Sequence, residues 1–150
     1  MVKLSIKSDF VFFSPGCPVG RPNIYLIHGE CFAFDKTKGR NKDDTKVYCS
    51  SVFGSALDGR IHEPRSRSVQ KAVLSKWNAF APGHNHWLGI TDNHRDGTWR
   101  YDSDNGTIAF SEWYNGQPNG GTGENCAFQG TTAHDYPCDK VDIYALCDLV

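Results

Sequence analysis

Side chains that carry amide or carboxylate oxygens gather in one short stretch of this sequence, around a proline and beside two cysteines. They are Gln117, Asn119, Glu124 and Asp135. Oxygen ligands of this kind suit Ca²⁺, which binds carboxylates and amide carbonyls in a flexible shell. Pro118 would hold the first two oxygens on one side, and a Cys126–Cys138 bridge would bring the last one round to meet them. The stretch therefore predicts a binding site for a hard cation.

The composition indicates one domain and excludes several classes of partner. A chain of 150 residues has the usual size of a single domain. The 16 basic and 17 acidic residues nearly balance, so neither nucleic-acid binding nor polybasic membrane attachment is indicated. No apolar run reaches the roughly 18–20 residues that a membrane span needs. One local basic cluster is interpreted as the solvated face of a helix: Arg60, Arg65, Arg67 and Lys71.

Six cysteines, an even number, favour three disulfides. Composition alone leaves 15 pairings open. Because disulfides form in oxidising compartments, we expect a secreted, extracellular protein. The N-terminus has no continuous apolar segment typical of a signal peptide, which fits a mature form with an added Met1.

Strand and helix signals alternate in the first part of the chain. Segment 2–13 alternates loosely between polar and apolar residues, which predicts a strand. The segment from Cys17 to Cys31 predicts a hairpin. Residues 42–53 are expected to be helical, with Val47 and Phe53 among the buried side chains.

A second helix is better marked. Pro64 suits the first turn of a helix, where its missing N–H costs nothing. Val69, Val73 and Trp77 then recur every four residues, which predicts an amphipathic stripe that packs on the core.

The second part of the chain predicts short strands joined by irregular loops. The strands are expected at residues 87–90, 97–101, 110–113 and 144–147. The loop over residues 114–125 is rich in glycine and asparagine. Loops of that length are usually functional or disordered, and the clustered oxygen ligands favour function.

Two other kinds of site find little support. Six histidines, among them His84, His86 and His94, raise transition-metal binding as an alternative, but no closed tetrahedral ligand set is specified. No nucleophile elbow and no phosphate-binding loop occurs, and the carboxylates fit metal ligation better than an acid–base pair. We therefore expect no enzyme.

The order of the motifs resembles that of C-type lectin-like domains over roughly residues 17–147. The segments that carry the resemblance are Cys17-Pro18, Cys31-Phe32, Cys49, Leu57, Glu63-Pro64, Trp87-Leu88-Gly89-Ile90, Gly97-Thr98-Trp99-Arg100-Tyr101, Trp113, Gly116-Gln117-Pro118-Asn119, Glu124-Asn125-Cys126 and Asp135-Tyr136-Pro137-Cys138. Each segment is weak alone, whereas their joint order is specific. The resemblance implies an α+β fold over residues 1–150, with two helices flanking small antiparallel sheets and a long loop for Ca²⁺ and sugar.

The resemblance also implies disulfides and ligands. The implied bridges of this long form are Cys17–Cys31, Cys49–Cys147 and Cys126–Cys138. The implied Ca²⁺ ligands are Gln117, Asn119, Glu124 and Asp135, which would also bind sugar hydroxyls together with His134. The Gln117–Pro118 bond is expected to be cis.

Two positions depart from the family pattern. His134 stands where the family usually has asparagine, and imidazole matches a hard cation poorly. It would contact the metal, contact the sugar, or turn away. Gln117-Pro118-Asn119 combines the halves of the mannose-type and galactose-type tripeptides, so it predicts relaxed specificity for mannose, galactose or GalNAc. Tyr114 and Tyr136 are further candidates to pack on a sugar.

An auxiliary Ca²⁺ site and a rival function remain open. Asp92, Asp96 and Glu124 match the auxiliary site, but Gly120 and Asn125 stand where acidic ligands would help. The expected function is recognition of cell-surface or microbial glycans in innate immunity, agglutination or symbiont recognition. The alternative is a domain of this fold that binds a protein, ice or a mineral surface.

Two features bear on assembly and modification. No coiled-coil neck is present, so a homo-oligomer would have to form through the domain itself. Asn105-Gly106-Thr107 is a glycosylation sequon on an expected turn.

Overall fold

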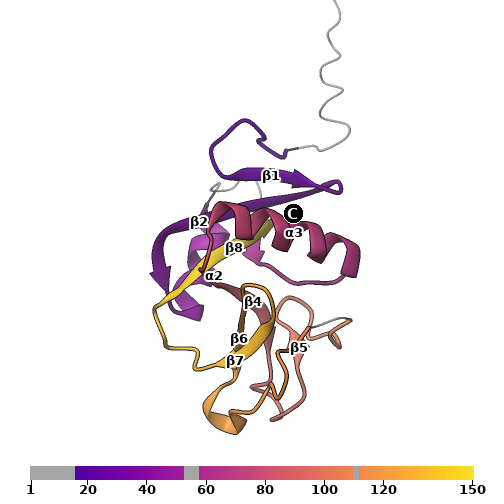
Figure 1. Cartoon of the computed structure of the whole chain (residues 1–150), viewed down its shortest axis with the longest axis vertical. Coiled ribbons are helices and arrows are strands. Elements are labelled where there is room, and N and C mark those ends of the chain that lie inside the picture. The colour runs from indigo at the N-terminus through magenta and orange to yellow at the C-terminus, as the bar shows by residue number, and fades with distance from the viewer. Residues whose placement is uncertain (1–15, 53–57, 110–111) are drawn as a thin grey trace, which may run out of the picture.

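The computed structural model of the chain describes residues 16–52, 58–109 and 112–150, which form the expected α+β architecture (Figure 1). Its elements are β1 (Ile24–Ile27), β2 (Glu30–Arg40), α2 (Lys42–Ser51), β3 (Gly59–Ile61), α3 (Arg67–Phe80), β4 (His86–Thr91), β5 (Arg100–Tyr101), the 3₁₀ helix η2 (Gly121–Gly123), β6 (Cys126–Gln129), β7 (Ala133–Tyr136) and β8 (Ile143–Leu149). The predicted strand at 2–13, the side chains of Phe53 and Leu57, and residues 110–111 of another predicted strand lie outside the described residues.

One mixed sheet joins the small antiparallel sheets expected from the sequence. Its strand order is β1-β2-β8-β4-β6-β7, with β3 on β8 and β5 on β4. The pairings are antiparallel except where β4 runs parallel to β8, at His86 and Tyr144. Figure 1 shows β1, β2 and the helices at one end of the molecule and the β4–β7 strands with their loops at the other.

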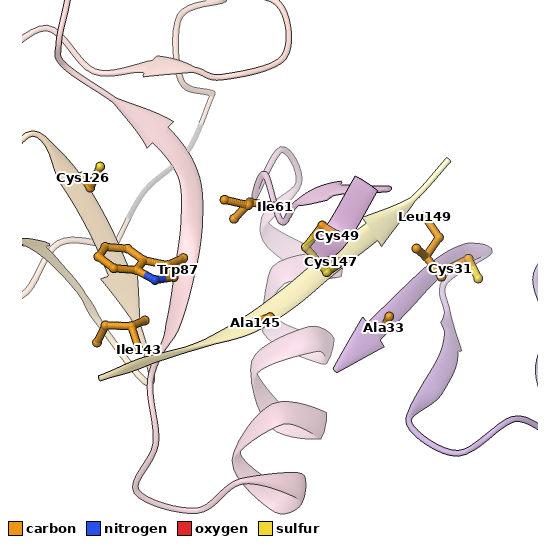
Figure 2. Close-up of a cluster of buried hydrophobic side chains, with 10 residues drawn as sticks. All are labelled: Cys31, Ala33, Cys49, Ile61, Trp87, Cys126, Ile143, Ala145, Cys147 and Leu149. Carbon is orange, nitrogen blue, oxygen red and sulfur yellow. A yellow bond between two sulfur atoms is a disulfide. The ribbon is translucent and has the colours of Figure 1, made fainter. Parts of the chain in front are cut away.

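The three disulfides are those that the resemblance implied: Cys17–Cys31, Cys49–Cys147 and Cys126–Cys138. Cys49–Cys147 ties α2 to the central strand β8 and closes a sequence separation of 98 residues. It lies in a buried cluster with Ile61, Trp87 and Ala145, drawn in Figure 2. The covalent link between α2 and β8 is therefore made inside the core.

Helix α2 begins directly after Asn41, whose side chain caps it. The Asn41 side chain accepts a hydrogen bond from the N–H of Asp44 at 2.8 Å, and Asp43 and Asp44 place negative charge in the first turn. Cys49 is fully buried. The prediction for Val47 was wrong, because its side chain is 65% exposed and lies on the solvent face.

Helix α3 begins later than predicted. Ser66 caps it by accepting from the N–H of Val69, so Pro64 precedes the helix. The predicted stripe is confirmed at Val73 and Trp77, which are fully buried, and Val69 packs against the same cluster.

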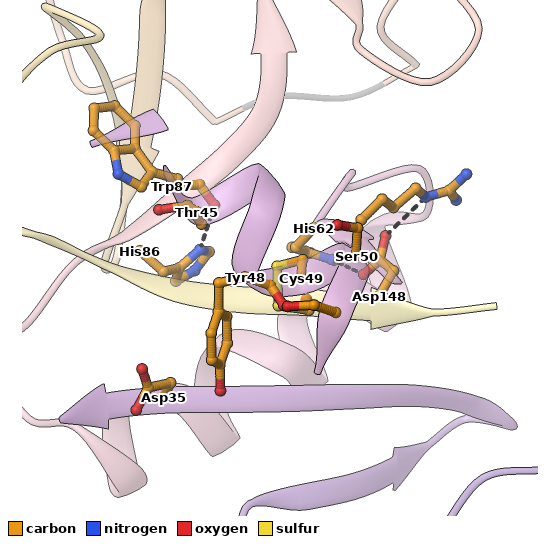
Figure 3. Close-up of a disulfide and its surroundings, with 12 residues drawn as sticks. Asp35, Thr45, Tyr48, Cys49, Ser50, His62, His86, Trp87 and Asp148 are labelled. Atoms are coloured by element: carbon orange, nitrogen blue, oxygen red, sulfur yellow. Dashed lines mark hydrogen bonds and ion pairs between the residues drawn. A yellow bond between two sulfur atoms is a disulfide. The ribbon is translucent and has the colours of Figure 1, made fainter. Parts of the chain in front are cut away.

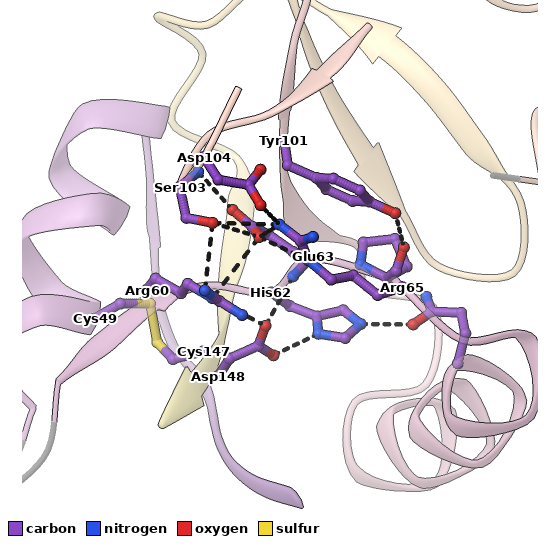
Figure 4. A network of polar contacts seen from close by, with 12 residues as sticks. Cys49, Arg60, His62, Glu63, Arg65, Tyr101, Ser103, Asp104, Cys147 and Asp148 are labelled. Atoms are coloured by element: carbon purple, nitrogen blue, oxygen red, sulfur yellow. Dashed lines mark hydrogen bonds and ion pairs between the residues drawn. A yellow bond between two sulfur atoms is a disulfide. The ribbon is translucent and has the colours of Figure 1, made fainter. Parts of the chain in front are cut away.

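Arg60 and Arg65 do not lie on a helix face, which corrects the interpretation of the basic cluster. Arg65 binds the buried Glu63 at 2.7 Å, and its guanidinium lies over the Tyr101 ring at 3.9 Å. Glu63 also accepts from the N–H and hydroxyl of Ser103 at 2.8 Å (Figure 4). This network fastens the segment before α3 to the loop after β5.

Strand β4 passes close to that segment. The N–H of Gly89 donates to the carbonyl of His62 at 2.7 Å. A β-carbon on Gly89 would lie 2.6 Å from the Ile61 carbonyl oxygen, so the close approach requires glycine. The predicted strand at 87–90 is confirmed within β4, and that at 144–147 within β8.

Elsewhere the strand predictions were too long. The strand predicted at 97–101 contracts to the two residues of β5. Of residues 112–113, Trp113 forms an isolated bridge to Ala133. In the described part of the chain, no helix has the length and apolar content needed to cross a membrane.

Candidate functional site

Asp135 anchors the long loop to the sheet. Its position on β7 pairs with Ala127 of β6, and its side chain is buried. Its Oδ2 accepts hydrogen bonds from the N–H groups of Asn119, at 2.9 Å, and Gly120, at 2.7 Å. The carboxylate therefore fixes the tripeptide backbone, and its other oxygen remains available.

The loop reaches Asp135 through a defined path. It starts with a turn in which the N–H of Gln117 donates to the Tyr114 carbonyl at 2.8 Å. The Gln117–Pro118 peptide bond is cis, as expected from the resemblance. After Asn119 the chain passes through η2 and enters β6 at Cys126, whose disulfide to Cys138 closes the base of the loop.

Three buried oxygens at this end of the molecule have no hydrogen-bond partner among the described residues: Gln117 Oε1, Asp92 Oδ1 and Asp135 Oδ1. A buried acceptor without a partner costs about 1–3 kcal/mol, and more when it is charged. Such groups are rare in folded proteins and indicate a missing water, ion or ligand.

A small cavity lies beside two of these groups, Asp92 and Asp135. Its volume is about 100 Å³, and it is lined by Asp92, Asp96, Gly97, Trp99, Pro118, Gly121 and Asp135. Burial raises the pKa of Asp92, and the charges of Asp96 and Asp135 raise it further, against a hydrogen bond from the Gly97 N–H. The cavity therefore collects the negative charge of Asp92, Asp96 and Asp135.

Glu124 stands beside the same carboxylate. Desolvation raises the pKa of Glu124, and the neighbouring Asp135 raises it further by its charge and by a hydrogen bond. Gly120 makes room for this side chain, because a β-carbon on Gly120 would overlap the Glu124 carboxyl. Two like charges held this close are stabilised by a bound cation.

The donor set fits a hard cation. Among the described residues, no three His, Cys, Asp or Glu side chains form a metal cluster by themselves. Amide oxygens from Gln117 and Asn119 would have to complete a site, and such oxygens suit Ca²⁺ rather than Zn²⁺. The alternative of a histidine site gains no support, since His86 is fully buried and His84 packs on the Tyr144 ring at 4.8 Å.

His134 lies in an aromatic stack. Its ring is 5.0 Å from the Tyr114 ring, at 15°, and 5.2 Å from the Phe128 ring, at 12°. Successive residues of a strand point to opposite faces, so His134 and Asp135 diverge along β7. Tyr114 is 53% exposed and covers one side of the imidazole, and Tyr136 packs edge-on against Phe128 and bonds to Asp142. The structure thus directs His134 away from the face to which Asp135 points.

One buried charge near the loop was not predicted from the sequence. Lys42 begins α2, yet its side chain is only 9% exposed and forms an ion pair with Asp102 at 3.1 Å. Its Nζ donates to the Ile90 carbonyl at 3.1 Å. A lysine at the start of a helix usually extends into solvent, and its partner lies far along the chain.

The sequon residue Asn105 lies on an exposed turn with a positive φ of 57°. Asparagine tolerates this left-handed conformation better than most residues. Its position at the surface agrees with the turn expected from the sequence.

Comparison with known proteins agrees with this architecture. The family described as Lectin C-type domain matches residues 38–149. Perlucin-like protein from Mytilus galloprovincialis is 27% identical over 110 residues, covering 73% of this chain and 65% of that protein. The chain thus spans less than two thirds of this relative.

Solved structures share the fold at low sequence identity. C-type lectin CEL-I from Cucumaria echinata has a TM-score of 0.74 at 17% identity, covering 88% of this chain and 98% of that one. A Ca²⁺-dependent type II antifreeze protein has a TM-score of 0.70 at 20% identity, covering 85% and 97%. Because the family match extends over most of the chain, this protein belongs to the C-type lectin domain family.

Proposed function

We propose that this domain binds carbohydrate in a calcium-dependent manner, through the loop that carries Gln117, Asn119, Glu124 and Asp135. The observation that carries the proposal is the set of buried oxygens without partners, at Gln117, Asp92 and Asp135. A Ca²⁺ ion held by Gln117, Asn119, Glu124 and Asp135 would satisfy the Gln117 and Asp135 oxygens, and Asp92 would be satisfied by a second ion. Binding of the ion would need less ordering of the loop, because Asp135 already holds the backbone of residues 119–120.

The ion and the loop side chains would make different contacts with a bound sugar. When bound, the ion supplies a positive centre to which the hydroxyls of a sugar coordinate. Gln117 and Asn119 would turn their amide oxygens to the ion and their NH₂ groups to the hydroxyls, since each amide has both an acceptor and donors. Because both sides of the tripeptide then donate, we expect mannose-, galactose- and GalNAc-type glycans to be bound with little discrimination.

Asp92 and Asp96 support a proposal for a second, auxiliary ion. Both line the small cavity with Asp135, and Glu124 lies beside that carboxylate. An ion there would stabilise the loop rather than contact sugar. Gly120 and Asn125 stand where further acidic ligands would strengthen this second site.

The setting follows from the same features. Three disulfides suit an oxidising compartment, so we propose an extracellular protein that recognises glycans on cell or microbial surfaces. Weak single sites gain avidity when several copies are joined. A homo-oligomer formed through the domain would serve that purpose.

A titration with matched variants tests the proposal. Calorimetry should detect Ca²⁺ binding to the wild type, and Asp135→Asn should weaken it by at least about tenfold because a carboxylate ligand loses its charge. Asp104→Asn is the control, since Asp104 is an exposed carboxylate in a surface ion pair with Arg65. A glycan array should give signals that EDTA abolishes.

The alternative is binding of ice, a mineral or a protein without sugar, and the fold similarity to an antifreeze protein favours it as the second candidate. Surface or protein binding that is indifferent to both free sugar and EDTA, with an empty glycan array, would establish that alternative and refute the lectin proposal.

A further inference from the structure

Lys42 contacts both halves of the disulfide at the base of the loop. Its backbone N–H donates to the carbonyl of Cys138 at 3.0 Å. Its side-chain Nζ lies 3.9 Å from the Sγ of Cys126. A single residue thus places the start of α2 and a buried ammonium group against one disulfide.

Neighbouring groups hold this ammonium in a fixed position. Burial lowers the pKa of Lys42, and the ion pair with Asp102 opposes that effect only in part. The bonds to Asp102 and to the Ile90 carbonyl hold Nζ in place beside the sulfur. The N-terminal end of α2 adds the positive end of a helix dipole, which also favours a thiolate nearby.

The same disulfide is accessible to small molecules. A cavity of about 440 Å³ reaches both Cys126 and Cys138. Besides the two cysteines, the charged or titratable groups on its wall are Lys42, Asp43, Lys46, His94, Tyr101 and Asp102. Cys138 is partly exposed, whereas Cys49 and Cys147 have no exposed surface. Reductants can therefore reach one bridge of the site and not the bridge in the core.

We propose that Cys126–Cys138 is a thiol–disulfide exchange site, whose reaction partner is a small dithiol or a dithiol protein. A thiolate of the partner attacks Cys138 Sγ and forms a mixed disulfide, and the S–S electron pair leaves on Cys126 as a thiolate beside Lys42. The second thiol of the partner then releases Cys138. The partner is oxidised to its disulfide, and its two electrons and two protons reduce the protein bridge to two thiols.

Lys42 acts here as a positioning residue that stabilises the leaving group, the Cys126 thiolate. Exchange is faster when the departing thiol has a lower pKa, with a rate that changes by about three- to tenfold for one to two pKa units. The ammonium beside Cys126 stabilises the departing thiolate. It also directs attack to Cys138, because that attack is the one that leaves the charge on the sulfur nearest Lys42.

Exchange at this site would act on the loop. Glu124 lies two residues before Cys126, and Asp135 three residues before Cys138. The disulfide closes residues 126–138, and opening it removes the covalent link that keeps Glu124 and Asp135 close together. This consequence rests on the proposed function, and we expect the reduced protein to bind Ca²⁺ at least tenfold more weakly.

Reduction kinetics test the exchange site without Ca²⁺ or sugar. The folded protein is treated with dithiothreitol, free thiols are alkylated at intervals, and each disulfide is quantified by peptide mass spectrometry. Lys42→Met should slow the opening of Cys126–Cys138 about three- to tenfold. Cys17–Cys31 should open at an unchanged rate in this variant.

The result cannot be confused with damage to the fold. Loss of structure would speed reduction, which is opposite to the effect expected of Lys42→Met, and it would open the core bridge Cys49–Cys147 as well. Only molecules with that bridge intact are counted. An unchanged or faster rate for Cys126–Cys138 in Lys42→Met, with Cys49–Cys147 closed, overturns the proposal.

The link to the loop has its own readout. Calorimetry compares Ca²⁺ binding by the oxidised protein and by protein reduced and alkylated at Cys126 and Cys138 alone. Equal affinities would disprove the link while leaving the exchange site in place. No Ca²⁺ binding by the oxidised protein would instead refute the proposed function, and the kinetic test of Lys42 would stand independently.

Discussion

The imidazole of His62 is bound by Asp148 across the buried end of β8, with 2.6 Å between Nδ1 and Oδ1 (Figures 3 and 4). The other ring nitrogen faces the Gln70 carbonyl oxygen at 2.5 Å, because the Gln70 NH₂ group donates to Gln129. Both ring nitrogens therefore donate, which only the protonated imidazole does. The two contacts therefore favour the protonated form of this buried histidine.

The charge on His62 predicts lower stability at alkaline pH. Burial alone would lower the pKa of His62, but the charge of Asp148 and the hydrogen bonds from the ring raise it above 6.5. A raised folded pKa contributes stability that is complete below the unfolded pKa and is lost as pH rises through the folded value. Urea midpoints of the wild type should therefore fall as the pH rises above about 6.5, towards and through the raised pKa of His62.

The matched variant is His62→Gln. Breaking a buried pair on one side costs about 3–5 kcal/mol, so this variant should be less stable at every pH. Its urea midpoint should also lose the alkaline decline, since the titrating group is gone. An equal decline in both proteins would show that His62 is not the group responsible.

His86 predicts the opposite behaviour at acid pH. Its Nδ1 donates to the Trp87 carbonyl, and its Nε2 is buried with no partner among the described residues. Burial, and secondarily the charge of His62, lower the pKa of His86 to about 3. The unfolded chain then takes up a proton below its ordinary pKa of 6.5, where the native state does not. Stability of the order of 4 kcal/mol is lost towards pH 3.

His86→Phe should remove this acid weakness. Phenylalanine keeps a ring against Trp77, on which His86 packs edge-on at 4.9 Å. Circular dichroism should place the acid-unfolding midpoint of the variant at lower pH than that of the wild type. The expectation fails if both proteins unfold at the same pH.

Much of the scaffold was predictable because its signals are local or ordered along the chain. The stripe of Val73 and Trp77 identifies the buried face of α3. The disulfides were implied by the family resemblance, which the order of the motifs carries. The start of α3 was missed because Pro64 was given more weight than the capping hydroxyl of Ser66. Val47 was misplaced because a short helix has too few apolar residues to define its buried face.

Parts of the site depend on contacts between distant residues. The stack of His134 requires Tyr114, twenty residues away in the sequence. The burial of Lys42 requires Asp102 and the Ile90 carbonyl. No periodicity or spacing encodes such pairs, so the sequence predicted the ligand types of the loop but not how these side chains are directed.

Two glycines of the loop provide a matched test of the cation site. A β-carbon at Gly120 would overlap the Glu124 side chain, whereas one at Gly123 would meet no atom within 4 Å. Gly120→Ala should therefore displace Glu124 and weaken Ca²⁺ binding by about tenfold or more, which corresponds to about 1.4 kcal/mol. Gly123→Ala should bind as the wild type does. Equal effects of the two substitutions in calorimetry would remove Glu124 from the ligand set.

Calcium should also raise the thermal stability of the domain. A ligand that binds only the native state at 100 times its Kd contributes about 2.7 kcal/mol. For a domain of this size, that corresponds to an increase in Tm of roughly 5–10 °C. Differential scanning fluorimetry should show the increase in the wild type, its reversal by EDTA, and its absence in Asp135→Asn. A Tm insensitive to Ca²⁺ in the wild type would contradict a site of useful affinity.

The parallel contact of β4 with β8, at His86 and Tyr144, divides the sheet into two ladders of different character. On one side β8 is paired with β2 and β3 and anchored by a core disulfide, while on the other side β6 and β7 depend on β4 and on the bridge below the loop. Local opening can therefore proceed in the β6–β7 hairpin while the β2–β8 ladder stays closed. Amide protons of the hairpin would then exchange with solvent well before those of β8, and a bound ligand could leave through a partial opening that spares the rest of the fold.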